Sequence, residues 1–187
     1  MTRNPGRLIP DDFSATPSLG AIPTVTLAQE LGEQGLDAIG VVVTRDGDLP
    51  AGLELDREAL AFAGFEAKPG TTLTLARSRR PLIVVVGAGA STELGTARLR
   101  DAAAAFARAT SRFGRIGLRL PSIGTTDAAD AAQALAEGAI LARYRFSELQ
   151  RKPKDTLLDR IELLIDGVDR GASRDDAGLD ALSLIHI

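Results

Sequence analysis

The sequence contains no cysteine and no tryptophan, and only one methionine, one tyrosine and one histidine. Without cysteine the chain forms neither disulfide bonds nor thiolate metal sites. The single histidine, His186, is the second-last residue, so the body of the chain has no histidine for acid–base chemistry or for a zinc site. These absences exclude several common classes of enzyme centre.

A strong charge of one sign and a long apolar run are also absent. The 22 lysines and arginines against 25 aspartates and glutamates leave a formal net charge of -3, which favours neither nucleic acid nor an anionic membrane. No apolar run approaches the ~18 residues of a membrane span, and the N-terminus lacks a signal-peptide core. With 187 residues, 44% of them hydrophobic, the chain is expected to be a cytoplasmic globular protein without a membrane partner.

The stretch from Pro81 to Phe113 predicts the fold class. Residues 82–86 read Leu-Ile-Val-Val-Val, an apolar run typical of a strand that is buried on both faces. A turn with two glycines follows at 87–92. The predicted helix over 96–113 has an apolar seam of Leu99, Ala103, Phe106, Ala109 and Phe113. Strand, turn and helix form half of a βαβ unit and predict an α/β fold.

Apolar alternation, helical periodicity and turn residues predict the remaining elements. Strands are predicted at residues 24–28, 36–44, 71–76, 115–120 and 161–165, and helices at 56–63 and 128–146. The uniformly apolar runs at 36–43 and 82–86 are expected at the centre of a mixed sheet. The strand at 71–76 is expected to pair with 82–86 across a solvated basic turn at 77–80. Residues 125–127 offer an N-cap for the alanine-rich helix at 128–146, with Asp127 and Asp130 as acidic residues of its first turn. This helix is expected to be buried on more than one side.

The glycine turn at 87–92 has two interpretations. It could cradle a phosphate, but a dinucleotide fingerprint requires a third glycine where this chain has Thr92, and no P-loop lysine is present. The favoured interpretation is a tight βα turn, because glycine permits positive φ and close backbone approach.

Several short segments occur in an order and spacing that resemble a known family. They are Gly-Asp-Leu-Pro at 47–50, Ala-Gly-Phe-Glu-Ala-Lys-Pro-Gly at 63–70, Val-Val-Val-Gly at 84–87, Ala-Gln-Ala-Leu-Ala-Glu-Gly-Ala-Ile-Leu at 132–141 and Tyr-Arg-Phe at 144–146. Residues 36–165 resemble the N-terminal domain of the leucyl aminopeptidase family, also called M17. The resemblance implies a macro-domain-like mixed sheet flanked by helices. It also implies a following catalytic domain with two divalent metals (zinc or manganese), peptide substrates and a homohexamer.

The family's metal-binding signature, Asn-Thr-Asp-Ala-Glu-Gly-Arg, has no counterpart in this sequence. The nearest match is Ala136-Glu137-Gly138, without Asn-Thr-Asp before it or Arg after it. Glu137 is therefore interpreted as an ordinary helical glutamate and Gly138 as a close-packed glycine. No catalytic, cofactor-binding or metal-binding residue of the family can be carried onto this chain.

The resemblance suggests a division of the chain into four parts. Residues 1–20 are expected to be a flexible lead-in, 21–168 the domain, and 169–181 a linker toward a catalytic domain that is absent here. The last six residues, Leu-Ser-Leu-Ile-His-Ile at 182–187, are similar to a translated sequencing adapter and are interpreted as a scar, although their alternation also suits a strand.

Three functions are weighed. The first is a non-catalytic accessory domain for domain packing and oligomer assembly, inactive alone because its aspartates (Asp46, Asp48, Asp127, Asp130, Asp175 and Asp176) are spread over turns, helix starts and a linker. The alternative is a stand-alone macro-like module that binds an ADP-ribose-type ligand at 87–92, with Glu93 and Asp101 as the nearest acidic residues. Nucleic-acid binding is disfavoured, because the basic residues are scattered and one aromatic is near them (Arg79, Arg80, Arg151, Lys152, Lys154 and Tyr144).

Overall fold

A computed structural model of the chain describes residues 22–32, 34–50, 53, 55–121, 126–144 and 156–166. The predictions of a lead-in at 1–20, a linker at 169–181 and a scar at 182–187 lie outside these ranges. So do the predictions made for Arg151, Lys152, Lys154, Asp175, Asp176 and His186.

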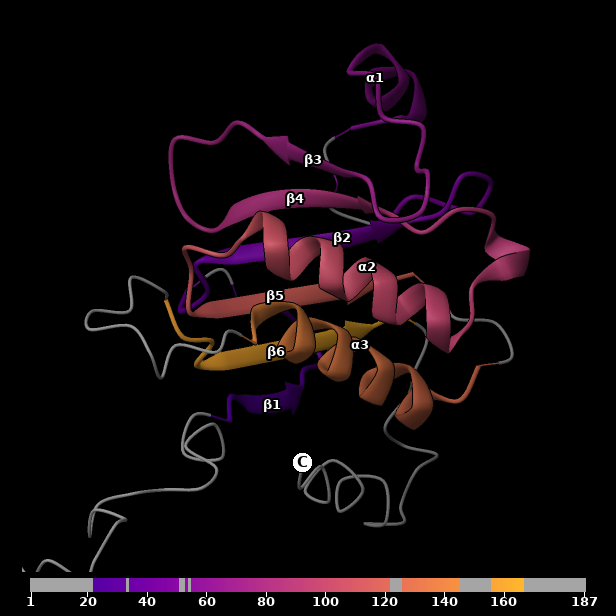
Figure 1. The fold of residues 1–187 in the computed structure, drawn as a ribbon. Coiled ribbons are helices and arrows are strands. Elements are labelled where there is room, and N and C mark those ends of the chain that lie inside the picture. Colours follow the sequence, from indigo (N-terminus) through magenta and orange to yellow (C-terminus); the bar gives the residue numbers. More distant parts are fainter. Residues whose placement is uncertain are drawn as a thin grey trace, which may run out of the picture.

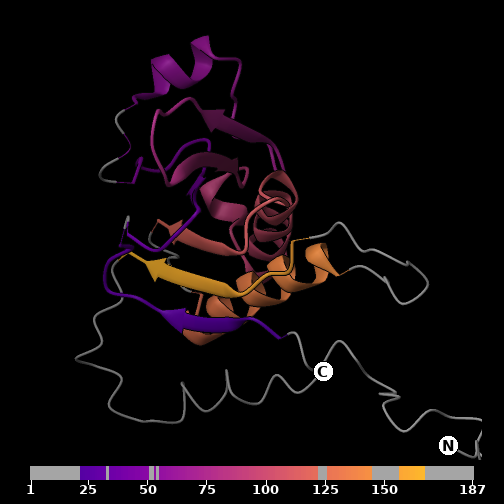
Figure 2. The same cartoon turned by 90° about the vertical axis from the view of Figure 1, so that its left-hand side faces the viewer.

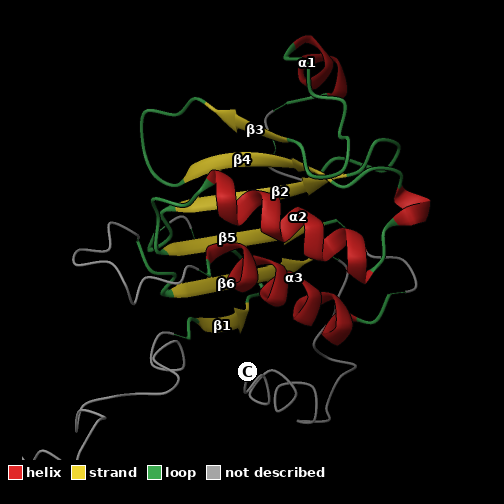
Figure 3. Ribbon diagram, in the orientation of Figure 1, coloured by secondary structure: helices red, strands yellow, loops and turns green. Residues whose placement is uncertain are grey.

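The described residues form one mixed six-stranded sheet with helices, which confirms the predicted α/β class (Figures 1 and 3). The strands are β1 (Thr24–Leu27), β2 (Ala38–Val43), β3 (Thr72–Leu75), β4 (Leu82–Gly87), β5 (Arg115–Leu120) and β6 (Arg160–Ile165). The helices are α1 (Arg57–Phe62), α2 (Thr96–Ala109) and α3 (Ala128–Arg143), with a 3-10 turn at Ser91–Glu93. The strand order is β1-β6-β5-β2-β4-β3. All neighbouring strands are parallel except β3, which pairs antiparallel with β4 as predicted.

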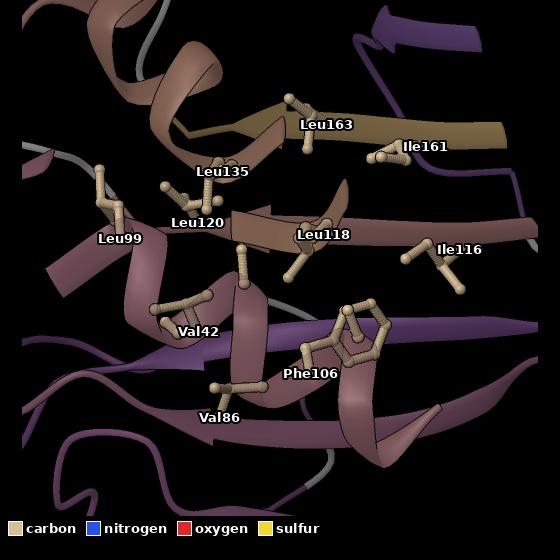
Figure 4. Packing of buried hydrophobic residues seen from close by; sticks show 14 of the residues in the cluster. Val42, Val86, Leu99, Phe106, Ile116, Leu118, Leu120, Leu135, Ile161 and Leu163 are labelled. Atoms are coloured by element: carbon tan, nitrogen blue, oxygen red, sulfur yellow. The ribbon is translucent and has the colours of Figure 1, made fainter. Parts of the chain in front are cut away.

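The two long helices, α2 and α3, lie on the same face of the sheet (Figures 1 and 2). Since side chains alternate along a strand, β2 contributes Ala38 and Val42 to the core beneath these helices. Phe106 of α2 packs directly over Gly40, where a β-carbon would lie 2.9 Å from the ring. Figure 4 shows this core, in which Phe106 lies among aliphatic side chains from the strands and α3.

The opposite face of β2 and β4 is covered by α1 and by leucine-rich connecting segments. Ile39, Val41 and Val43 of β2 and Val85 of β4 form a second buried cluster there with Leu60 of α1. Both faces of β2 are therefore buried, and all six of its residues are buried. This explains why an unbroken apolar run, instead of an alternating one, encodes this strand.

The connection from β4 to β5 passes over β2, because β4 and β5 lie on either side of that strand. Helix α2 makes this crossing, and its residues Leu99, Ala103 and Phe106 are completely buried. The predicted half of a βαβ unit is thus present, and α2 packs on β2, the strand that lies between β4 and β5.

Two details of the predicted helices are wrong. Helix α2 ends at Ala109 and not at Phe113. The amide and the hydroxyl of Thr110 both still donate to the carbonyl oxygen of Phe106, but the amides of Ser111 and Phe113 donate to Arg108 and Thr110, three residues earlier, so a turn replaces the α-helix. Ala109 is exposed, and Thr110 takes the predicted core position. Helix α3 ends at Arg143, with Tyr144 as its C-cap. None of the described helices has the length and apolarity needed to cross a membrane.

Candidate functional site

The carboxyl ends of the parallel strands are the first place to examine, because ligands of open α/β sheets bind there. At this edge the loop after β2 and the turn after β4 are joined by backbone hydrogen bonds. The amide of Arg45 donates to the carbonyl oxygen of Gly89 at 2.8 Å, and the amide of Ala88 donates to that of Val43 at 3.0 Å. The glycine turn at 87–92 is therefore fixed to its neighbour.

Four of the amides in this turn, those of Gly87, Ala88, Gly89 and Ser91, already have acceptors within the protein. Gly87 N–H donates to Thr71 and Gly89 N–H donates to Ala67, both at 2.9 Å. The amide of Ser91 donates to Asp46 Oδ1 at 2.7 Å, and Ser91 Oγ lies 3.1 Å from Asp46 Oδ2. The Ser91 amide holds the pKa of Asp46 below its ordinary value. A carboxylate of the chain itself thus occupies the donors an anion would use.

Both glycines of the turn have structural explanations. A β-carbon on Gly87 would lie 2.7 Å from the carbonyl carbon of Ala67, and Gly89 has a φ of +85°. Helix α2 begins only at Thr96, after the 3-10 turn that contains Thr92. The site geometry therefore agrees with a tight βα turn, the favoured sequence interpretation.

We expect no measurable binding of ADP-ribose to this chain up to millimolar ligand. The amides of Gly87, Ala88, Gly89 and Ser91 are engaged. The Asp46 carboxylate repels phosphate, and Glu93 is engaged by Arg98 at 3.3 Å. Isothermal titration calorimetry checks this, with Asp46→Asn as a matched variant that removes the negative charge. Micromolar binding by the unmodified chain would contradict the expectation and support the binding-module alternative.

A second polar cluster lies around Asp37, at the amino ends of the parallel strands. Its side chain, 9% exposed, accepts from Arg80 Nη1 at 2.6 Å, from Arg115 Nη2 at 3.3 Å and from the Arg115 amide at 3.1 Å. Residues 77–80 are exposed, as predicted for a solvated turn, and Arg80, whose side chain is 70% exposed, also pairs with Asp37. Sequence reasoning missed Asp37. It could have been found from the sequence, because Asp37 stands between Leu36 and Ala38 at the start of a buried strand. A buried carboxylate needs charged or hydrogen-bonding partners.

The ionised form of Asp37 is favoured in the folded protein. Burial opposes its charge, but the hydrogen bonds from the Arg115 side chain and amide, with the charges of Arg115 and Arg80, outweigh burial and lower the pKa. A lowered pKa contributes stability that is present above the unfolded-state value of about 3.9 and is lost as pH falls through the folded-state value.

Asp37→Asn is therefore expected to lower the free energy of unfolding by about 1–3 kcal/mol at neutral pH. The difference from the unmodified chain should shrink as the pH falls from about 3.9 through the lowered folded-state pKa, because the wild-type carboxylate then becomes protonated as well. Urea denaturation across this range measures both quantities. Asp48→Asn, at an exposed aspartate, is the control and should change the midpoint little. A difference that is independent of pH would show that charge is not the cause.

The remaining carboxylates that the sequence singled out do not converge. Asp127 caps α3 by accepting from the amides of Ala129 and Asp130, and Asp130 is exposed in the first turn of α3. Glu137 accepts from Gln133 at 2.8 Å and from Arg100 at 2.6 Å, and these bonds lower its pKa. Across the described ranges no group of three or more His, Asp or Glu side chains could hold a metal ion. The residues present do not fit the metal centre that the resemblance implies for the family.

Gly138, beside Glu137, is close-packed as predicted. A β-carbon there would overlap the backbone carbonyl of Arg100 on α2 and would lie 2.9 Å from its carbon atom. Of the basic and aromatic residues considered for nucleic acid, Arg79 is exposed and Tyr144 is 60% exposed at the end of α3. Arg80 is held by Asp37, as described above.

Comparison with known proteins identifies relatives for this fold. The sequence model of the cytosol aminopeptidase family, N-terminal domain, matches residues 54–153. A probable cytosol aminopeptidase from Rippkaea orientalis is 31% identical over 137 residues, which cover 71% of this chain and 27% of that protein. The chain thus spans about a quarter of the length of this relative.

Solved structures agree with this match. The bottromycin maturation enzyme BotP in complex with Mn is 26% identical with a TM-score of 0.53, and the alignment covers 79% of this chain and 29% of that one. A mutant of tomato leucine aminopeptidase has a TM-score of 0.56 at 20% identity, covering 76% of this chain and 32% of that one. At that identity the tomato enzyme shows a shared fold only.

Proposed function

The chain belongs to the cytosol aminopeptidase family as an N-terminal domain, and we propose that it is the non-catalytic accessory domain of a metal-dependent leucyl aminopeptidase. The main support for this proposal is that the chain matches the N-terminal domain of the family. The matching sequence model is that of the N-terminal domain, and the aligned region makes up 27% of a relative named for aminopeptidase activity.

The metal chemistry is proposed to reside in the part of the enzyme that follows residues 169–181. A solved relative, BotP, is in complex with Mn, which supports a divalent-metal hydrolase, with two zinc or manganese ions as the resemblance implies. The described residues of this chain offer no such centre, because their carboxylates bind arginines and backbone amides. Activating water at neutral pH requires a metal held by several ligands or a tuned general base.

The proposed role of residues 21–168 is structural. The domain is macro-like, packs against the catalytic domain of its own polypeptide and helps to arrange the subunits of a cytoplasmic homohexamer that acts on peptides. The described surface supports this role through its exposed apolar side chains, which include Phe62, Leu141 and Tyr144. Single exposed apolar residues are common, but a domain that docks on others needs such contacts.

The purified chain should not hydrolyse leucine p-nitroanilide, with or without added manganese or zinc. The physical reason is the lack of a ligand set that could activate water in the described part of the chain. A spectrophotometric assay beside a full-length leucine aminopeptidase as positive control measures this. Turnover that persists after trace host peptidase has been removed would contradict the proposal.

Parentage and role are tested on the longer gene product. The genomic reading frame beyond Ala181 should continue into the metal-binding signature of the family. In the enzyme so defined, deletion of residues 21–168 should reduce the mass of the assembly measured by light scattering. An intact oligomer after the deletion would contradict the assembly role, and a reading frame without the signature would contradict the enzymatic parentage.

A further inference from the structure

Helix α1 presents an aromatic side chain entirely to solvent. Phe62 is 97% exposed, the highest value among the large apolar side chains of the described residues. The helix projects beyond edge strand β3, at the end of the sheet remote from β1 and β6 (Figures 1 and 2). Burying a phenylalanine removes about 150–250 Å² from water, so this position is unfavourable without a partner.

The six-residue helix is held firmly to the domain. Leu60 is 3% exposed in the second core cluster, and the Asp56 side chain caps the helix by accepting from the Ala59 amide at 2.7 Å. The Arg57 guanidinium donates to the carbonyl oxygens of Thr44, Arg45 and Gly47. Phe62 is therefore presented on a fixed support, a property of the aromatic anchors that dominate binding energy at interfaces.

A hollow of about 550 Å³ lies beside the same helix, and we call it the α1 hollow. Its lining has an apolar part (Val43, Leu60, Ala61, Phe65 and Ala67) and a charged part with three basic residues and one acidic residue (Arg45, Arg57, Lys68 and Glu66). A cavity of about 150 Å³ accommodates benzene, so the hollow can admit a phenyl ring with room for neighbouring atoms. Lys68 is paired with Glu66 at 2.7 Å, whereas the Arg45 side chain donates no hydrogen bond within the described part of the chain.

The exposed face of α1 is chemically complementary to this hollow. Glu58 and Phe62 are four residues apart, so they lie on one face of the helix, and both are exposed. This face offers a phenyl ring and a carboxylate, while the hollow offers an apolar part and a charged part that is mainly basic. The Phe62 ring and the α1 hollow both adjoin helix α1. In a two-fold interface the same surface patch of each copy meets that of the other, so each copy would insert its ring and accept the ring of its partner.

We infer that α1 and the α1 hollow form a contact between two copies of this chain, with Phe62 of each copy in the hollow of the other and Glu58 facing Arg45. The inference rests on the assembly role proposed above and names its contact surface. Two phenyl rings bury about 300–500 Å² together, well short of the 1,200–2,000 Å² of a stable interface. The contact is therefore weak in the isolated chain, which should associate only at high protein concentration.

Sedimentation equilibrium of the purified chain over a wide concentration range tests the contact. The average mass should rise from monomer toward dimer as concentration increases. Phe62→Ser should raise the dissociation constant at least about tenfold, whereas Leu157→Ser, at a 69% exposed site before β6, should not. Circular dichroism and thermal melting verify that each variant remains folded.

Charge reversal supplies an independent check. Glu58→Arg and Arg45→Glu should each weaken association, and the double variant should recover it, because the ion pair is restored with reversed sign. A wild-type chain that stays monomeric at every concentration, or a Phe62→Ser variant that associates normally, overturns the inference. Either result leaves the accessory-domain role intact, since deletion of the domain from the longer enzyme tests that role separately.

Discussion

Replacing Gly138 by valine is expected to lower the free energy of unfolding by about 3 kcal/mol or more. Gly138 lies in the middle of α3 where this helix crosses α2, and a β-carbon would overlap the backbone carbonyl of Arg100. A flexible side chain could move aside, but a helix backbone cannot move without separating the two helices. The Arg100–Glu137 ion pair, 2.6 Å long and adjacent to the crossing, would be disturbed as well.

A smaller substitution, Gly138→Ala, distinguishes steric overlap from helix propensity, because the two effects change the free energy of unfolding in opposite directions. Glycine to alanine in a helix interior normally stabilises by about 1 kcal/mol, yet Gly138→Ala should destabilise because the methyl group has no space. Urea denaturation measures both variants. Leu141→Val, at an exposed position on the same helix, is the control and should stay within about 0.5 kcal/mol. A stabilising Gly138→Ala would refute the proposed close approach of α2 and α3.

Phe106→Ala is expected to cost about 3–5 kcal/mol. Phe106 is the largest fully buried side chain of the described residues, and its ring fills the space above Gly40, which has no side chain of its own. Figure 4 shows the ring beside Ile116 and Leu118. Because the alanines of α2 and α3 are too short to reach into the vacated volume, the cavity would remain largely open.

The same substitution at another phenylalanine provides a matched control. Phe62→Ala removes an equal number of atoms from a side chain that is 97% exposed, so the free energy of unfolding of the monomer should change by less than about 0.5 kcal/mol. Thermal and urea unfolding at low protein concentration measure both variants. A cost below about 1 kcal/mol for Phe106→Ala would show that the core rearranges to fill the space.

The two predictions explain how a chain so poor in aromatic residues builds a core. Alanine and glycine allow α2 and α3 to approach each other and the sheet closely, and one phenylalanine fills the gap over β2. Helix α1 packs on the opposite face of the sheet, against the second cluster, and β2 contributes to both clusters. The proposed assembly role depends on that packing, because an anchor such as Phe62 contributes binding energy only where its support is fixed.

The helices and strands could be predicted from the sequence because each depends mainly on residues within its own segment. The apolar run at 82–86 specified a buried strand, alternating threonine and leucine specified the exposed edge strand β3, and Asp127 marked the start of α3. Gly138 was recognisable as a packing glycine by its place among alanines. The end of α2 was missed because the apolar periodicity continues to Phe113, whereas the hydrogen bonds after Thr110 are those of a turn.

The sequence by itself determined the helices and strands, the α/β class and the family resemblance. Each of these depends on residues that lie close together in the chain. Tertiary structure alone decided the strand order and the polar contacts at both ends of the parallel strands. Asp37 meets Arg115 across 78 residues and Asp46 meets Ser91 across 45. Such pairs are fixed by which strands become neighbours and in which register, and no local pattern encodes either. For the same reason, only the folded chain could bring Arg45 and Lys68 into the lining of the α1 hollow.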